Sequence, residues 1–234
     1  MILVDASEPR WNAHQQRSIR NALDQVYEGL GFNERLSVFT SEEDQIGSAA
    51  KITPRFSVCG TARAPEELES IGAESASEGY LRRTKERLYD KFLGPELDAL
   101  LTLSPESDRR QRYQSPVLEL LQAISRRPEA QHARKLIVIS DLLQNSDTAQ
   151  FCTVRMAMPY FEVFRQRRSY ARLTPEGFDG IDVELYLLQR QGFGGPALPY
   201  CRDEEELVRF YSDYFTHHGA RSVTLTRLRD GNVG

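Results

Sequence analysis

The sequence has few cysteines, no long hydrophobic run and no strong excess of one charge. Its 234 residues contain three cysteines, Cys59, Cys152 and Cys201, whose wide scatter matches neither a disulfide framework nor a metal-binding spacing. The thiols therefore fit a reducing compartment or an incidental role. No stretch approaches the roughly 18 apolar residues that a membrane-spanning helix needs, so we expect no span in this chain.

The charge balance excludes no class of protein outright. With 30 Lys and Arg against 34 Asp and Glu, the net charge is −4, which does not favour nucleic-acid binding but leaves room for a local basic patch. No signal peptide is visible, because the apolar start reaches Asp5 at once. The chain begins inside a predicted strand, so a native segment could precede it. A membrane anchor there would make the domain envelope-associated, and without one a cytoplasmic location is the default.

Apolar segments of strand type alternate with segments of helical period along the whole chain. The strands are predicted at 1–4, 36–40, 55–59, 135–140, 181–188 and around 223–225. This alternation predicts an α/β fold: a doubly wound, mostly parallel six-stranded sheet with helices on both faces. The link before 55–59 is polar and has no helical period, so this strand is expected to be the antiparallel edge. We expect one domain, 1–234, with an insertion of loops and helices at about 60–114.

Several residues predict where helices begin and end. Ser115 followed by Pro116 predicts an N-cap and the first residue of a helix. Pro9 suits the first turn of a helix that continues to about residue 30. Another helix is expected within 158–168, and the helical stretch 80–103 is expected to be interrupted near Gly94 and Pro95.

Oxygen-bearing side chains follow the ends of two predicted strands. Asp5 and Ser7 come after the first strand, and Asp141 ends the fourth. Ser115 opens the helix that leads into that fourth strand. Ligands of open α/β sheets bind at the carboxyl ends of the strands, so these four residues are expected to meet there. Two carboxylates and two hydroxyls, with water completing the shell, suit Mg²⁺ or a similar divalent cation.

The segment from Asp5 to Pro9, Asp-Ala-Ser-Glu-Pro, resembles the first loop of von Willebrand factor A-type domains. In that family an Asp-x-Ser-x-Ser loop, a Thr and a further Asp build a metal-ion-dependent adhesion site. The resemblance assigns Asp5 and Ser7 to the first two positions of the loop. Pro9 stands where the family has its second Ser, and Glu8 is the candidate to replace that lost ligand.

The two other loops of the site also resemble the family with departures. Ser115 stands where a Thr is usual, and Asp141 is followed by Leu142 where Asp-Gly is common. The resemblance implies a vWA-like domain with a degenerate adhesion site. It implies a non-enzymatic protein that binds a partner protein's carboxylate through a divalent ion. The alternative is that Asp5 and Asp141 only cap helices or turns at strand ends.

Three further features remain open from the sequence. Trp11, beside the predicted metal loop, either faces a partner or packs against that loop. Arginines interleaved with aromatic residues, at Arg165, Arg167, Arg168 and Arg172, suggest a different function, a metal-free scaffold that binds protein or nucleic acid. A metal-dependent hydrolase is a third interpretation, but no Gly-x-Ser-x-Gly elbow and no well-placed His supports it.

Overall fold

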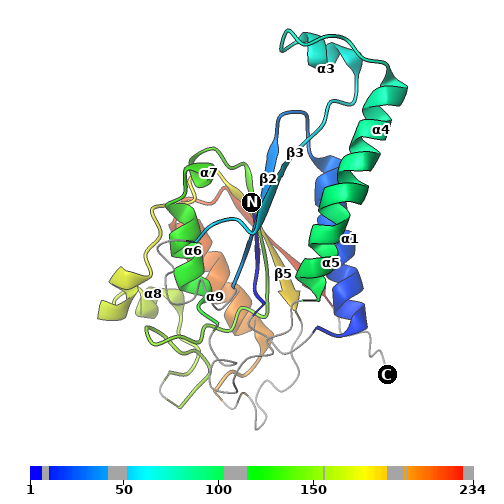
Figure 1. Cartoon of the computed structure of the whole chain (residues 1–234). Coiled ribbons are helices and arrows are strands. Elements are labelled where there is room, and N and C mark those ends of the chain that lie inside the picture. Colours follow the sequence, from blue (N-terminus) through cyan, green and yellow to red (C-terminus); the bar gives the residue numbers. More distant parts are fainter. Residues whose placement is uncertain are drawn as a thin grey trace.

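The computed structural model describes residues 1–6, 11–41, 52–102, 115–154, 156–188, 198 and 200–228. Its centre is one six-stranded sheet in the order β3-β2-β1-β4-β5-β6 (Figure 1). In that order the strands are Phe56–Cys59, Arg35–Thr40, Ile2–Val4, Lys135–Ser140, Asp182–Leu188 and Ser222–Leu228. Only the β2–β3 pair is antiparallel. The structure therefore confirms the predicted α/β fold and its antiparallel edge strand.

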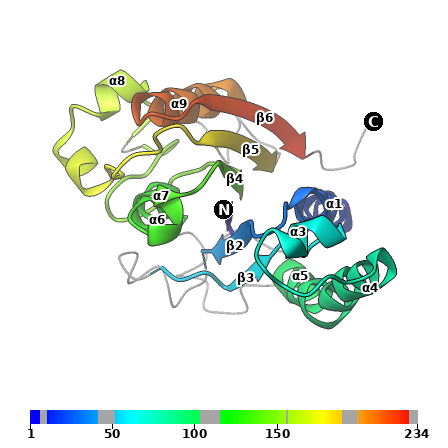
Figure 2. The same ribbon diagram turned by 90° about the horizontal axis from the view of Figure 1, so that it is seen from above.

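Helices cover both faces of the sheet (Figure 2). α1 (Ala13–Gly29) and α5 (Gly94–Leu101) pack on one face, and α6 (Val117–Ser125) and α9 (Glu204–His217) pack on the other. The alternation of side chains along β1 shows why two cores form: Ile2 and Val4 belong to the α1 side, and Leu3 belongs to the α9 side. None of the helices in the described ranges is long and apolar enough to cross a membrane.

Residues 65–101 form a helical arm within the predicted insertion. It contains α3 (Pro65–Glu69), α4 (Glu78–Leu88), the π-helical turn η2 (Tyr89–Leu93) and then α5. The predicted interruption at Gly94 and Pro95 is absorbed by this π turn, in which Gly94 N–H bonds to the Tyr89 carbonyl. Figure 1 shows α4 extending past the sheet, with α3 at its far end, on the side opposite the carboxyl ends of the strands.

Two predicted helix boundaries differ in the structure. α1 begins at Ala13, because Asn12 caps it: the Asn12 side chain accepts from the backbone N–H of Gln15, whose side chain accepts from Asn12 N–H. Pro9 lies outside the described residues. The helix expected within 158–168 is one short turn, α8 (Phe161–Phe164), and a 3₁₀ turn, η3 (Arg168–Arg172), follows it after a break.

The structure corrects the expectation for the cysteines. Cys152, in the long segment after β4, forms a disulfide with Cys201, just before α9, across a Cα–Cα distance of 4.9 Å. Both side chains are buried, whereas Cys59 is free and exposed. The sequence separation of 49 hid this pairing, because only the fold brings the two segments together. The bond ties the chain after β4 to the start of α9.

Candidate functional site

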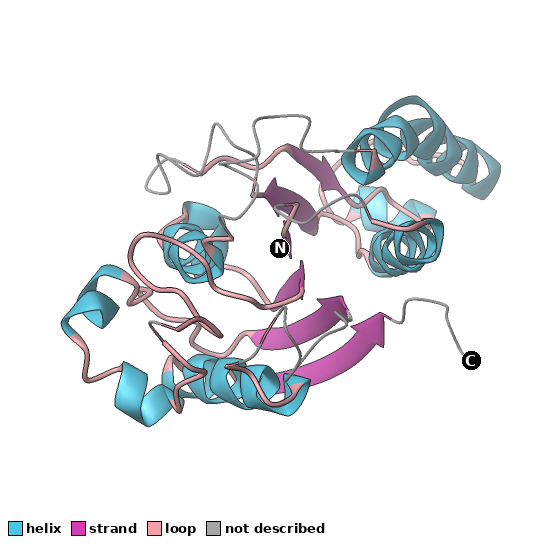
Figure 3. Ribbon diagram, turned by 90° about the horizontal axis from the view of Figure 1, so that it is seen from below, coloured by secondary structure: helices cyan, strands magenta, loops and turns pink. Residues whose placement is uncertain are grey.

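The predicted site residues lie at the carboxyl edge of the sheet. In Figure 1 the arrowhead of β5 points downwards, so Figure 3, the view from below, looks onto this edge. Asp5 follows β1 directly, and its backbone N–H still bonds to the Ile139 carbonyl of β4 at 2.8 Å. Asp141 follows β4. The two side chains are only 1 % and 3 % exposed, so each adjacent strand delivers a buried carboxylate to the same edge.

Three serine hydroxyls surround the Asp5 carboxylate. Ser41 donates to Asp5 Oδ1 at 2.9 Å, while Ser115 and Ser140 donate to Asp5 Oδ2 at 2.7 and 2.8 Å. The donors come from the end of β2, the start of α6 and the end of β4. Hydrogen bonds to a charged acceptor are among the stronger ones in proteins, and together they fix the orientation of this carboxylate.

Asp141 is held differently from Asp5. Its Oδ1 accepts from Leu143 N–H at 2.9 Å, across Leu142, which has a positive φ of 61°. Burial, followed by the negative charge of Asp5, raises the pKa of Asp141 to about 8 despite the bond from Leu143. The negative charge of Asp5 thus disfavours the ionised form of Asp141 in this dry site. A cation bound between them would remove this penalty.

The start of α6 corrects the predicted role of Ser115. Pro116, not Ser115, occupies the N-cap position, and the side chain of Gln144 replaces the missing cap by accepting from Leu118 N–H at 2.8 Å. Ser115 instead pairs through its backbone with Asn145, with two N–H···O bonds of 2.8 Å. Its hydroxyl is therefore available to the Asp5 carboxylate rather than to the helix backbone.

The structure brings Asp5, Ser115 and Asp141 together: Ser115 donates to Asp5, and the negative charge of Asp5 acts on Asp141. Ser7 and Glu8 lie outside the described residues, so the structure gives no position for these two predicted ligands. Trp11 is 6 % exposed and packs in the core on the α1 side. This burial favours the packing interpretation of Trp11 over a partner-facing one.

Ser41 and Ser140 were missed in the sequence. A signal for both exists, because each stands at the carboxyl end of a predicted strand: Ser41 directly follows Thr40, and Ser140 directly precedes Asp141. The rule that located Asp5 and Asp141 applies equally to these hydroxyls. Nothing local in the sequence, however, shows that a serine at a strand end will face a carboxylate.

The donor set fits a hard divalent cation. Mg²⁺ prefers oxygen ligands and is commonly held by one or two carboxylates with several waters completing its shell. Asp5 and Asp141 supply the carboxylates, and Ser115, which is hydrogen-bonded to Asp5, supplies a hydroxyl. Within the described ranges, no group of three or more His, Cys, Asp or Glu side chains is placed to hold a metal ion. The candidate site therefore depends on serine oxygens and water as well as on its two carboxylates.

The arginine-rich segment lies elsewhere, around α8 and η3. Tyr160 and Val163 are 61 % and 52 % exposed there. Arg165 forms an ion pair with Glu162 at 2.5 Å. The remaining arginines of the segment, Arg167, Arg168 and Arg172, are also exposed. This surface combines apolar and cationic groups.

Comparison with known proteins finds no matching family model, no matching curated protein and no matching solved structure. The structure itself supports a Rossmann-like α/β fold, with a mixed sheet and helices on both faces.

Proposed function

We propose that this protein is a non-enzymatic interaction domain that binds a partner protein through a divalent cation at the carboxyl edge of its sheet. The single observation that supports the proposal most is the pairing of two buried carboxylates, Asp5 and Asp141, on adjacent strands. The resemblance of the Asp5 loop to von Willebrand A-type domains agrees with this assignment.

Several residues would contribute ligands to the ion. Asp5 is oriented by the hydroxyls of Ser41 and Ser140, which leaves it a fixed ligand. Asp141 is oriented by Leu143 N–H. Ser115 offers a hydroxyl oxygen, and Ser7 and Glu8 are the remaining candidates from the first loop. Mg²⁺ is the ion that suits these oxygens, with Mn²⁺ a close chemical substitute.

Charge explains why an ion would control partner binding. Without an ion, burial and the negative charge of Asp5 favour the protonated form of Asp141, and the charge of Asp5 alone would still repel a partner's Asp or Glu. With an ion bound, both carboxylates are ionised and together carry −2. A divalent cation makes the site formally neutral and offers an unfilled coordination position. A carboxylate is a favoured ligand for such a position, so the partner should present an Asp or Glu.

Calorimetry with Mg²⁺ and Mn²⁺ tests the ion-binding step directly. The wild-type protein should bind with a measurable heat and a rise in the temperature of unfolding, and Asp141→Asn should lose both. Asp182→Asn is the matched control, because Asp182 is a partly exposed carboxylate at the amino ends of the strands and pairs with Arg221. Wild-type protein that gives neither heat nor thermal shift would reject the ion-binding proposal.

Partner capture tests the bridging step. A protein retained by the wild-type domain in Mg²⁺ should be released by a chelator and should not bind Asp141→Asn. Substituting an acidic residue of that partner by its amide should have the same effect as the chelator. A partner that survives both chelation and Asp141→Asn would show that the ion does not bridge the complex.

A second candidate function rests on the surface around α8. Exposed Tyr160 and Val163 lie beside Arg165, Arg167 and Arg168, a combination suited to an acidic protein surface. We propose it as the alternative, a metal-free scaffold. It predicts the opposite pattern: chelation is harmless, while Arg167→Ala with Arg168→Ala weakens binding and reduces its salt dependence.

A further inference from the structure

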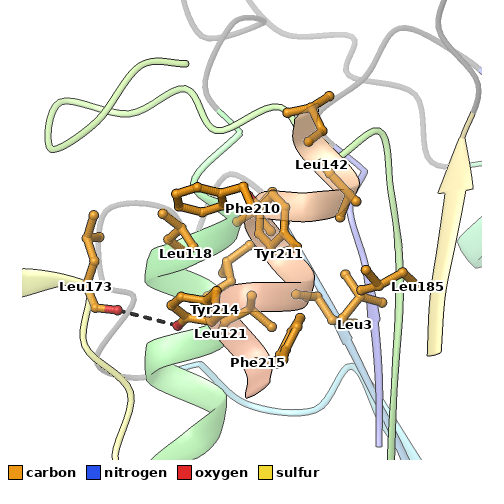
Figure 4. Close-up of a cluster of buried hydrophobic side chains, with 14 of the residues drawn as sticks. Leu3, Leu118, Leu121, Leu142, Leu173, Leu185, Phe210, Tyr211, Tyr214 and Phe215 are labelled. Carbon is orange, nitrogen blue, oxygen red and sulfur yellow. Dashed lines mark hydrogen bonds between the residues drawn. The ribbon is translucent and has the colours of Figure 1, made fainter. Parts of the chain in front are cut away.

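The carboxyl edge faces a buried tyrosine of α9. Tyr211 is 0 % exposed, and its ring packs against Phe210 at a centroid distance of 5.3 Å. Figure 4 draws Tyr211 in one cluster of buried side chains with Leu118, near the start of α6, and Leu142, the residue that follows Asp141. The tyrosine therefore lies in the core on the α9 side of the sheet, in the same cluster as the residue that follows Asp141.

The Tyr211 hydroxyl has no hydrogen-bond partner among the residues that the structure describes. The next tyrosine of the helix behaves differently. Tyr214, equally buried, donates its hydroxyl to the Leu173 carbonyl at 3.5 Å, the dashed line in Figure 4. A buried hydroxyl without a partner costs stability, and such groups in native proteins usually have a functional or solvent explanation.

The electrostatic surroundings of Tyr211 point to the site. Burial raises the pKa of Tyr211 well above its usual value, and the negative charges of Tyr214, Asp141 and Asp5 contribute in that order. Both site carboxylates therefore lie within electrostatic reach of the phenol. The corresponding influences on Tyr214 come from Tyr170 and Glu119 and from neither site carboxylate.

We propose that Tyr211 is a positioning residue of the ion site, whose phenol oxygen accepts a hydrogen bond from a water molecule that the ion binds. The inference rests on the proposed function, since it needs the ion. Mg²⁺ retains several waters in protein sites, and a metal-bound water is a strong hydrogen-bond donor. Such a water satisfies the Tyr211 hydroxyl, which has no partner within the described part of the chain.

The chain offers two matched controls for Tyr211→Phe. Tyr27→Phe removes another buried hydroxyl without a partner, on the opposite face of the sheet. Tyr214→Phe removes a partnered hydroxyl from the same helix. Calorimetry with Mn²⁺ and thermal unfolding without ion, on the full chain, are measured for the wild type and all three variants.

Tyr211→Phe should weaken Mn²⁺ binding by roughly 3- to 10-fold, the usual effect of losing one hydrogen bond. Its temperature of unfolding without ion should equal or exceed that of the wild type. Tyr27→Phe and Tyr214→Phe should bind Mn²⁺ as the wild type does.

Two results would overturn this inference and leave the proposed function intact. One is an unchanged Mn²⁺ affinity of Tyr211→Phe when the wild type binds Mn²⁺. The other is a lowered unfolding temperature of Tyr211→Phe without ion, which would show that a protein group already bonds the hydroxyl. Wild-type protein that binds no Mn²⁺ would instead reject the proposed function and this inference with it.

Discussion

At the carboxyl edge of the sheet, Asp5 and Asp141 are buried, whereas at the amino edge Lys135 and Glu184 pair in contact with solvent at 2.7 Å. A groove of about 990 Å³ opens the amino edge to water, and Lys135 lines it together with Arg134. Charges at the amino edge stay hydrated and screened, so they cost little folding free energy. Charges at the carboxyl edge lose their hydration, so each needs hydroxyls, backbone N–H groups or a cation as a replacement.

This difference explains where function is expected. Hydrogen bonds from Ser41, Ser115 and Ser140 hold Asp5 in one orientation, which a ligand for an ion needs. The side chains of Arg134 and Glu34, which form an ion pair at the amino edge, are 86 % and 43 % exposed. Such an exposed pair fixes the orientation of its side chains much less than the hydrogen bonds around Asp5 do. The same sheet thus carries a rigid polar site at one edge and ordinary solvated charges at the other.

The largest expected effect is the loss of ion binding in Asp141→Asn. The amide oxygen can still accept from Leu143 N–H, so the fold should persist, and its unfolding temperature without ion should equal or exceed that of the wild type. Removing a direct ligand should weaken Mg²⁺ affinity by more than the roughly 10- to 100-fold typical of an outer-shell partner. Calorimetry measures it. Retained affinity would place the ion away from Asp141.

The disulfide should contribute the next largest effect. Cys152→Ser with Cys201→Ser removes a bond that closes a loop of sequence separation 49, and should lower the free energy of unfolding by about 4 kcal/mol. Cys59→Ser, which changes an exposed free thiol, should leave it within about 0.5 kcal/mol of the wild type. Denaturant unfolding measures both. Equal stability of the two variants would show that the bond does not form in the native protein.

Ser140→Ala tests the hydroxyls around Asp5. Ser140 is fully buried, donates to Asp5 Oδ2 and accepts from Leu142 N–H. The substitution leaves a buried carboxylate short of one donor, so we expect a loss of about 1.5–3 kcal/mol in the free energy of unfolding. Denaturant titration provides the value. A loss below about 0.5 kcal/mol would mean that water replaces the hydroxyl, and the edge would then be wetter than its burial indicates.

A smaller, pH-dependent effect is expected at the amino edge, where His218 ends α9. Its Nε2 lies 2.5 Å from the Tyr170 hydroxyl, and burial, followed by His217, lowers the pKa of His218 to about 4, while Asp179 opposes the shift. The unfolded chain binds this proton at about pH 6.5 and the native one only near pH 4. Stability should therefore fall as the pH is lowered through this window.

His218→Gln should flatten that slope, because glutamine does not titrate. Unfolding temperatures measured at intervals from pH 4 to 7 provide the comparison. An identical slope in the variant would assign the acid sensitivity to other groups.

The smallest effect is expected for the exposed ion pair of Arg134 with Glu34. Arg134→Ala should change the free energy of unfolding by only about 0–1 kcal/mol, and added salt should reduce the change further. Unfolding curves at two salt concentrations measure it. A cost as large as that of Ser140→Ala would remove the distinction between the two edges.

The sequence by itself determined the strands, their helical connections and the edge at which Asp5, Ser115 and Asp141 meet. These features follow from local apolar periodicity and from the rule that parallel strands end together, which need no knowledge of distant contacts. The polar link before β3 was likewise enough to predict an antiparallel edge.

Only the tertiary structure decided which groups touch within that frame. The side chain of Gln144 caps α6 and leaves the Ser115 hydroxyl to Asp5. Gln144 and Ser115 are 29 positions apart in the sequence. The Cys152–Cys201 bond and the hydroxyl of Tyr211 depend equally on how α9 docks. Side-chain partners across a core are chosen by packing between distant segments, and no local pattern in a single sequence encodes that choice.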